Sequence, residues 1–166
     1  MLYFAYGSNM SPHRIRDRVS NADFVGVAVL QNFQLRFHKK GLDGSAKADA
    51  LYTGKVNDQI YGALYRLDGS DFSVLDRIES CGVGYERKEV KVNSVGGDVR
   101  AWVYCALHID RSLVPYHWYH QHVLEGAMQL GLPEGYIEHI KSFAVKVDKN
   151  EARTRKELAV YQMINN

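Results

Sequence analysis

The stretch YFAYGSNMSP at residues 3–12 constrains the fold more than any other part of the sequence. It joins an apolar run to a turn of small polar residues and then to a helix start. Ser11 is a favourable N-cap and Pro12 a favourable first helical residue. The sequence therefore predicts a strand at 2–6 that ends directly before a helix at 11–19.

The turn between these two elements is a candidate anion site. Gly7 lets the backbone approach a ligand closely, and the amides around Ser8 and Asn9 can point at an oxyanion or a carboxylate. The same residues also suit a plain strand-to-helix connection. Spacing alone leaves both interpretations open.

The rest of the chain predicts an α+β fold, because strands and helices do not alternate regularly. A polar, glycine-rich stretch at 38–48 is typical of a mobile loop, and we expect it near a pocket. Further strands are expected at 24–30, 33–37, 49–53, 60–67, 85–93 and 99–107, and helices at 71–79, 116–131, 134–143 and 150–163. We expect a small mixed barrel of about six to seven strands with flanking helices, since closure protects strand edges.

Size and charge bound the function. The chain has 166 residues, which fits a single domain at 1–166 with a C-terminal helical tail at 147–166. Its 21 Lys and Arg against 19 Asp and Glu give a formal charge of +2, which does not favour a nucleic-acid partner. Basic residues cluster only at 153–156, as is typical of a solvated helix face.

Targeting and redox signals point to a cytoplasmic protein. Met1 precedes a strand-like segment rather than a leader, and no apolar run approaches the ~20 residues needed to cross a membrane. Cys81 and Cys105 lack metal-binding spacing. We therefore expect a soluble chain without a membrane partner, in a reducing compartment. Cys81 suits a small core or loop residue better than a nucleophile.

Glu79 is the candidate acid–base residue. In a helix at 71–79, with Ser70 as its cap, Glu79 falls on the same face as Phe72 and Leu75. A carboxylate there is costly unless it is paired or used, and burial and the helix dipole both raise its pKa towards values useful for proton transfer. The alternative is that the helix frays before residue 80 and leaves Glu79 exposed.

Tyr85 begins the next predicted strand, where its hydroxyl can reach a ligand held near Glu79. Tyrosine is also common in strands, so a purely structural role is equally compatible with its position.

Metal and triad chemistry are not favoured. His117 and His120 share a helix face, but His122 and Glu125 do not converge with them on one ligand set. Ser8 is not in a G-x-S-x-G element. We therefore expect neither a metal nor a cofactor.

Three segments together resemble the γ-glutamylcyclotransferase family, from residue 3 to about 140. They are YFAYGSNM at 3–10, LDRIE at 75–79, and GAMQLGLP at 126–133 followed by Tyr136. The resemblance implies a mixed α/β fold around a small barrel, with the Tyr-Gly-Ser-Asn loop and an acid–base glutamate facing one cavity. That glutamate corresponds to Glu79. The chain departs from the family at Ser80, where Gly is frequent, and in a stretch to Tyr85 that is one residue shorter.

The resemblance also implies a reaction. The α-amine of a γ-glutamyl substrate attacks its own γ-amide carbon, forms 5-oxoproline and releases an amine or amino acid. Glu79 would transfer the protons, the amides of Gly7, Ser8 and Asn9 would hold a carboxylate or oxyanion, Tyr6 would shape the loop and Tyr85 would position the ligand.

Two other functions fit the same residues. One is a non-catalytic small-molecule binding module, and the other is a lyase that removes a γ-glutamyl group from a biosynthetic intermediate. The leaving amine and the oligomeric state are left open by the sequence.

Overall fold

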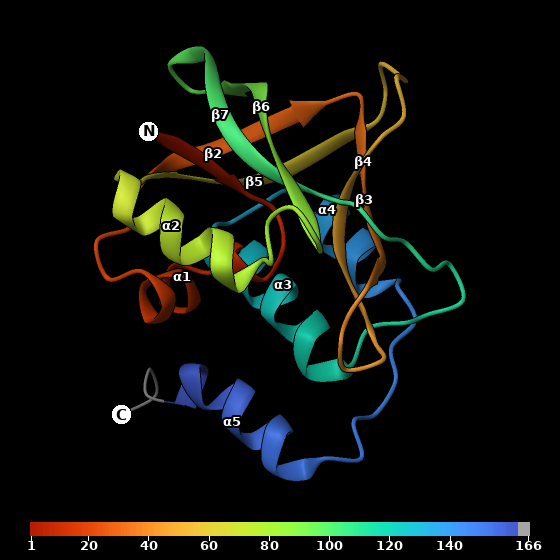
Figure 1. Ribbon diagram of the computed structural model, residues 1–166. Helices are drawn as coiled ribbons and strands as arrows, with labels where there is room; N and C mark the ends of the chain where they lie inside the picture. The colour runs from red at the N-terminus through yellow and green to blue at the C-terminus, as the bar shows by residue number, and fades with distance from the viewer. Residues whose placement is uncertain (163–166) are drawn as a thin grey trace.

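A computed structural model of the chain describes residues 1–162 and has an α+β architecture (Figure 1). Its strands are β1 (Leu2–Ala5), β2 (Asp23–Gln31), β3 (Phe33–Lys40), β4 (Ala46–Tyr52), β5 (Gln59–Arg66), β6 (Tyr85–Ser94) and β7 (Gly97–Ala106). Its helices are the 3₁₀ turn η1 (Ser8–Met10), α1 (Pro12–Arg18), α2 (Gly69–Ile78), α3 (His117–Gln129), α4 (Glu134–Lys141) and α5 (Glu151–Gln162). The end of the helix expected at 150–163 and the last residues of the 147–166 tail lie outside the described residues.

Five strands close a barrel in the order β1-β5-β2-β6-β7. Neighbouring strands are antiparallel except where β7 meets β1 in parallel, with Tyr3 opposite Trp102. The expected fold class is confirmed, but the barrel has five strands rather than six or seven, because β3 and β4 form a separate two-stranded sheet. Asn32, with φ of 68°, turns the chain away from the barrel after β2. Figure 1 shows α3 beneath the barrel and α5 beyond α3.

The segment expected as a loop at 38–48 is mostly strand. β3 continues to Lys40 and β4 begins at Ala46, so the connection is only five residues, 41–45. Gly41 N donates to Ser45 O at 2.9 Å and closes this turn. The prediction of a long loop was wrong because the lysines of this segment are polar positions of a paired ribbon.

The structure refines one predicted helix cap and corrects another. Ser11 is the N-cap residue of α1, as predicted, but its side chain makes no capping hydrogen bond, because its hydroxyl donates to Gln129 Oε1 on α3 at 2.8 Å. α2 is capped by Asp68 rather than Ser70, because Asp68 and Asp71 each accept a hydrogen bond from the other's backbone N–H. α2 ends at Ile78, and Glu79 is its C-cap residue.

α3 packs closely on the segment that follows β1. A Cβ placed on Gly126 would lie 2.8 Å from Ser11 N and 3.0 Å from Met10 Cβ. The helix ends where Gly131, with φ of 60°, donates to Met128 O, and Leu132 donates to Ala127 O. The absence of a side chain at 126 therefore fixes how near α3 comes to η1.

None of the helices within residues 1–162 is both long enough and apolar enough to span a membrane.

Replacing Gly126 by Ala should destabilise the fold, because the added methyl group meets backbone atoms that cannot move aside. We expect the free energy of unfolding to fall by about 1–3 kcal/mol. Gly135→Ala on α4 is the matched control, since nothing lies within 4 Å of its Cβ position. This change should stabilise the protein by about 0.4–1 kcal/mol. Urea unfolding measures both, and equal stabilities of the two variants would contradict the packing argument.

Candidate active site

A cavity of about 820 Å³ opens between α1, the end of α2, the β3–β4 ribbon and α5. A small inner pocket of about 20 Å³ lies against it. Ser8, Glu79, Tyr85 and Tyr119 line both spaces. The cavity therefore has an inner end at the loop that follows β1 and an outer chamber bounded by α5.

The inner pocket brings together every site residue that the sequence suggested. These residues come from the loop after β1, from the end of α2 and from the start of β6. They are Tyr6, Gly7, Ser8, Asn9, Glu79 and Tyr85. The pocket is also lined by Tyr3, Tyr104 and Tyr119, which the sequence did not single out.

Glu79 turns inward although the helix ends before it. Its side chain is 17% exposed, whereas Ile78 beside it is 42% exposed. One carboxylate oxygen, Oε1, accepts from Asn9 Nδ2 at 3.1 Å and from Arg18 Nη1 at 3.2 Å. No hydrogen bond from residues 1–162 reaches the other oxygen, Oε2. The carboxylate is thus held through one oxygen and leaves the other available to a ligand.

Arg18 is the charged site residue that sequence reasoning missed, in addition to the three tyrosines. It lies in the last turn of α1, and its Nη1 also donates to Asn9 Oδ1 at 2.7 Å. The expectation for Glu79 rested on burial and the helix dipole and included no cation. Arg18 is 61 residues away from Glu79 in the chain, so no local spacing connects them. The only signal was that Arg14 and Arg18 share one face of a short helix.

Asn9 positions other side chains. Its Nδ2 donates to Tyr3 Oη and to Glu79 Oε1, both at 3.1 Å, while its Oδ1 accepts from Arg18. The side-chain amide is therefore occupied within the protein, and the backbone amides of the loop are what remain for an anion.

Tyr6 and Tyr85 are tied to the backbone. Tyr6 Oη donates to Tyr104 O at 2.5 Å, which fastens the loop after β1 to β7. Tyr85 Oη donates to Ala48 O at 2.7 Å, so its proton is committed to the ribbon. The ring of Tyr85 lines the site. That its hydroxyl positions a ligand stays a prediction, and this bond limits the hydroxyl to accepting.

Tyr3 and Tyr119 have the opposite arrangement. Tyr3 Oη accepts from Asn9, and Tyr119 Oη accepts from Ala48 N at 3.1 Å. Neither hydroxyl donates to an acceptor within the described part of the chain. Burial raises the pKa of both groups above the ordinary value of tyrosine, with the nearby Glu79 carboxylate adding to the effect. Both are therefore neutral hydroxyls with a proton to offer in the inner pocket.

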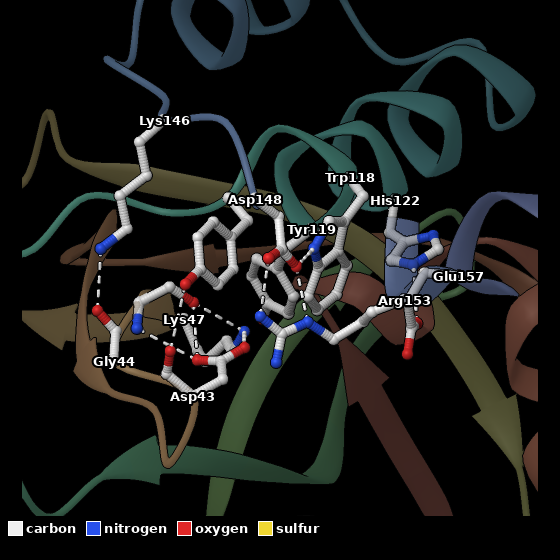
Figure 2. Close-up of polar contacts among 12 residues, drawn as sticks. Asp43, Gly44, Lys47, Trp118, Tyr119, His122, Lys146, Asp148, Arg153 and Glu157 are labelled. Carbon is white, nitrogen blue, oxygen red and sulfur yellow. Dashed lines mark hydrogen bonds and ion pairs between the residues drawn. The ribbon is translucent and has the colours of Figure 1, made fainter. Parts of the chain in front are cut away.

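The C-terminal segment forms one wall of the outer chamber (Figure 2). Asp148 accepts two hydrogen bonds from the guanidinium of Arg153 and one from Trp118 Nε1 at 2.8 Å. These bonds, led by that of Arg153, lower the pKa of Asp148 well below its usual range. Close by, Lys47 Nζ donates to Asp43 Oδ2 at 2.7 Å. The Asp148–Arg153 ion pair thus orders the start of α5, and the hydrogen bond from Trp118 fixes it to α3.

The middle of α5 is held in the same way. Glu157 Oε2 accepts from Arg14 Nη1 at 3.0 Å and lies 3.3 Å from His122 Nε2. His122 Nδ1 lies 2.9 Å from the hydroxyl of Tyr161. Burial lowers the pKa of His122 to about 4, and hydrogen bonding to His122 lowers that of Glu157 to about 2.

The other histidines of α3 are separate from this contact. His117 is exposed, and His120 Nε2 lies 2.7 Å from Ile140 O. Within residues 1–162, no group of three His, Cys, Asp or Glu side chains is placed to hold a metal ion. Cys81 is exposed, and burial raises the pKa of Cys105 to about 12, which disfavours its thiolate.

Known proteins are similar to this chain in sequence and in fold. The model of the AIG2-like family matches residues 59–140. A protein of Mus musculus named gamma-glutamylcyclotransferase is 33% identical over 146 residues, which cover 85% of this chain and 77% of the mouse protein. The Homo sapiens protein of the same name is 31% identical over 150 residues, with the same coverage of both chains.

A solved structure described as a gamma-glutamyl cyclotransferase superposes with a TM-score of 0.79 at 28% identity. The match covers 93% of this chain and 98% of the other. The agreement therefore includes the barrel, the ribbon and most of the helices.

The contact between α3 and α5 should make the fold sensitive to acid. The pKa of His122 is about 4 in the folded protein and about 6.5 when unfolded, so only the unfolded chain takes up this proton between those values. Stability should fall as the pH drops from 6.5 towards 4, by up to about 1.4 kcal/mol per pH unit. His122→Phe should flatten this dependence, and His117→Phe, at an exposed position, should not.

Urea unfolding between pH 7 and 5 measures these slopes. Burial also lowers the pKa values of His120 and His139, so the difference in slope between wild type and His122→Phe, rather than the wild-type slope itself, reports His122. Identical slopes for wild type and His122→Phe would contradict the assignment.

Proposed function

The chain belongs to the γ-glutamylcyclotransferase family of enzymes, and on this premise we propose that it converts a small γ-glutamyl amide or dipeptide into 5-oxoproline and a free amine or amino acid. The observation that carries the proposal is the geometry of Glu79. One carboxylate oxygen is fixed by Asn9 and Arg18, and the other has no hydrogen bond within residues 1–162, where the inner pocket meets the outer chamber.

The reaction takes place within one substrate molecule. The α-amine attacks the γ-carbonyl carbon, a C–N bond forms to close the five-membered ring, and the original amide C–N bond breaks. One proton leaves the attacking nitrogen and one reaches the departing nitrogen. An intramolecular attack held in a reactive conformer reaches effective molarities of ~10⁵ M or more. The protein therefore needs to fold the substrate and move protons, without forming a covalent intermediate.

Glu79 carries both proton transfers in this mechanism. The α-ammonium first loses one proton to solvent and becomes the attacking amine. As the ring bond forms, Oε2 accepts a second proton from that nitrogen and passes it to the leaving nitrogen, while Oε1 stays bonded to Asn9 and Arg18. Those two residues position the carboxylate. General acid–base catalysis of this kind contributes ~10²–10⁴-fold in rate.

The backbone amides of the loop after β1 bind the carboxylate of the substrate or the oxyanion that forms during the reaction. The first N–H groups of a helical turn lack partners inside the turn, and Gly7, Ser8 and Asn9 bring theirs to the inner pocket. A Cβ on Gly7 would lie 3.1 Å from Ala48 Cβ and 3.8 Å from Tyr119 Oη. A side chain there would enter the pocket, which supports close approach of the substrate to the backbone. The free protons of Tyr3 and Tyr119 add two further donors.

A second candidate is a lyase that removes a γ-glutamyl group from a larger intermediate. The outer chamber favours it, since about 820 Å³ has room for a leaving group bigger than one amino acid. The chemistry at Glu79 is the same in both cases. A panel of γ-glutamyl compounds with leaving amines of increasing size separates the two by which compound is turned over fastest.

Glu79→Gln should lower the rate of 5-oxoproline formation by roughly 10²–10⁴-fold, because the amide keeps an oxygen for Asn9 and Arg18 but accepts no proton. Substrate binding should persist. Mass spectrometry of 5-oxoproline and calorimetric binding measure the two properties. Glu89→Gln is the control, since Glu89 is exposed on β6 and pairs with Arg100. Full activity in Glu79→Gln would refute the mechanism, and ligand-induced stabilisation of the wild type without turnover would indicate a binding module.

A further inference from the structure

Four of the six Lys and Arg side chains on the wall of the outer chamber form ion pairs within the protein. Most of the cationic side chains that line it have a carboxylate partner on a neighbouring element. The pairs are Arg14 with Glu157, Arg18 with Glu79, Lys47 with Asp43, and Arg153 with Asp148. Such pairs fix the wall and give each of these four cations a carboxylate partner within the protein.

Lys39 is the exception on this wall. It lines the same cavity and is half-buried, yet no carboxylate within residues 1–162 forms an ion pair with it. Its Nζ lies 4.8 Å from the centre of the Tyr85 ring. A Cβ placed on Gly84 would come within 3.1 Å of Nζ and 3.0 Å of Glu79 O. The ammonium group is thus held beside the segment that carries Glu79. Lys40 also lines the cavity, but it is exposed.

The backbone directs Lys39 to this place. The register of β3 against β4 shifts between Phe37 and Lys39, and this irregularity sets Lys39 opposite Lys47. Residues opposite each other on a ladder share a face of the sheet, and like charges there are destabilising. Asp43 forms its ion pair with Lys47 and acts on Lys39 only at longer range, as does Glu79. Within residues 1–162, the ribbon therefore presents two lysines without an ion pair to the cavity, of which only Lys39 is half-buried.

We propose that Lys39 binds an anionic group, a carboxylate or a phosphate, on the part of the substrate that is released. The inference rests on the proposed function, which puts the γ-glutamyl carbonyl next to Glu79. Tyr85 lines both the inner pocket and the outer chamber, so a leaving group extending outward from Glu79 passes its ring and reaches Lys39. An anion there gives the ammonium the partner that the protein does not supply. A neutral amine leaves it unpaired.

A different role for Lys39 is electrostatic support of Glu79 alone. The two roles predict different kinetics. Recognition of a leaving-group anion changes KM for anionic substrates and spares neutral ones, because the contact forms in the bound ground state. Support of Glu79 changes kcat for every substrate equally.

Three substrates that differ only in the distal group test the proposal. They are γ-glutamyl-glycine, its neutral isostere γ-glutamyl-glycinamide, and γ-glutamyl-aminomethylphosphonate. The variants are Lys39→Met, which keeps the aliphatic stem, and Lys39→Arg, which keeps the charge. Lys141→Met is the matched control for net charge, because Lys141 is exposed on α4 and pairs with Glu138.

We expect wild type to favour γ-glutamyl-glycine over the glycinamide by roughly 10–100-fold in kcat/KM, as a charge-assisted hydrogen bond allows. Lys39→Met should reduce this preference to about 2-fold or less through KM, with turnover of the glycinamide unchanged. Lys39→Arg should restore most of it, and Lys141→Met should match wild type. The phosphonate shows which anion is preferred.

Two outcomes would overturn the proposal, namely an intact carboxylate preference in Lys39→Met or an equal loss of kcat on all three substrates. Calorimetric binding of the same compounds to Glu79→Gln measures anion recognition by Lys39 independently of the proposed cyclisation. If 5-oxoproline forms without an anion preference, the role of Lys39 is wrong and the cyclisation stands. If Lys39-dependent anion binding occurs without 5-oxoproline, the cyclisation is wrong and anion recognition stands. If neither 5-oxoproline formation nor Lys39-dependent anion binding occurs, both proposals are refuted.

Discussion

The contact of Asn9 and Arg18 with one oxygen of Glu79 is the interaction on which the rest of the site depends. It joins the loop after β1, the end of α1 and the end of α2 at one carboxylate. A carboxylate of which only 17% is exposed is costly without such partners. Because both bonds are taken on Oε1, Oε2 has no hydrogen bond within residues 1–162, at a residue that lines both the inner pocket and the outer chamber. Pairing within the protein and availability to a ligand are thereby combined in a single side chain.

The packing of the helices makes this contact possible. α3 approaches η1 closely because Gly126 has no side chain, and this sets the position of the loop that carries Asn9. α5 then packs outside α1 and α3, where Arg14, His122 and Glu157 form a largely buried cluster. The outer chamber is therefore bounded by charge pairs that fix its walls. Lys39 differs from these pairs in having no carboxylate partner in the described part of the chain.

Local sequence signals predicted most of the elements and six of the residues that line the inner pocket. The strand before Gly7, the helix start at Pro12 and the inward position of Glu79 all follow from spacing over fewer than ten residues. Sequence polarity led to a wrong prediction where polar residues line a pocket. The lysines of 38–48 suggested a loop, although they belong to a paired ribbon that faces a cavity. Hydropathy cannot distinguish a polar cavity wall from a solvent-exposed face.

The sequence by itself determined the α+β class, the strand-loop-helix unit at residues 2–18 and the candidate acid–base glutamate, because each depends on short-range periodicity, capping and turn chemistry. Only the tertiary structure decided which cation meets Glu79, which tyrosine protons remain free and which lysine lacks a partner. Those facts depend on contacts between residues far apart in the chain, such as the 61 positions between Arg18 and Glu79. The packing of the whole fold determines these contacts, and no local sequence pattern predicts them.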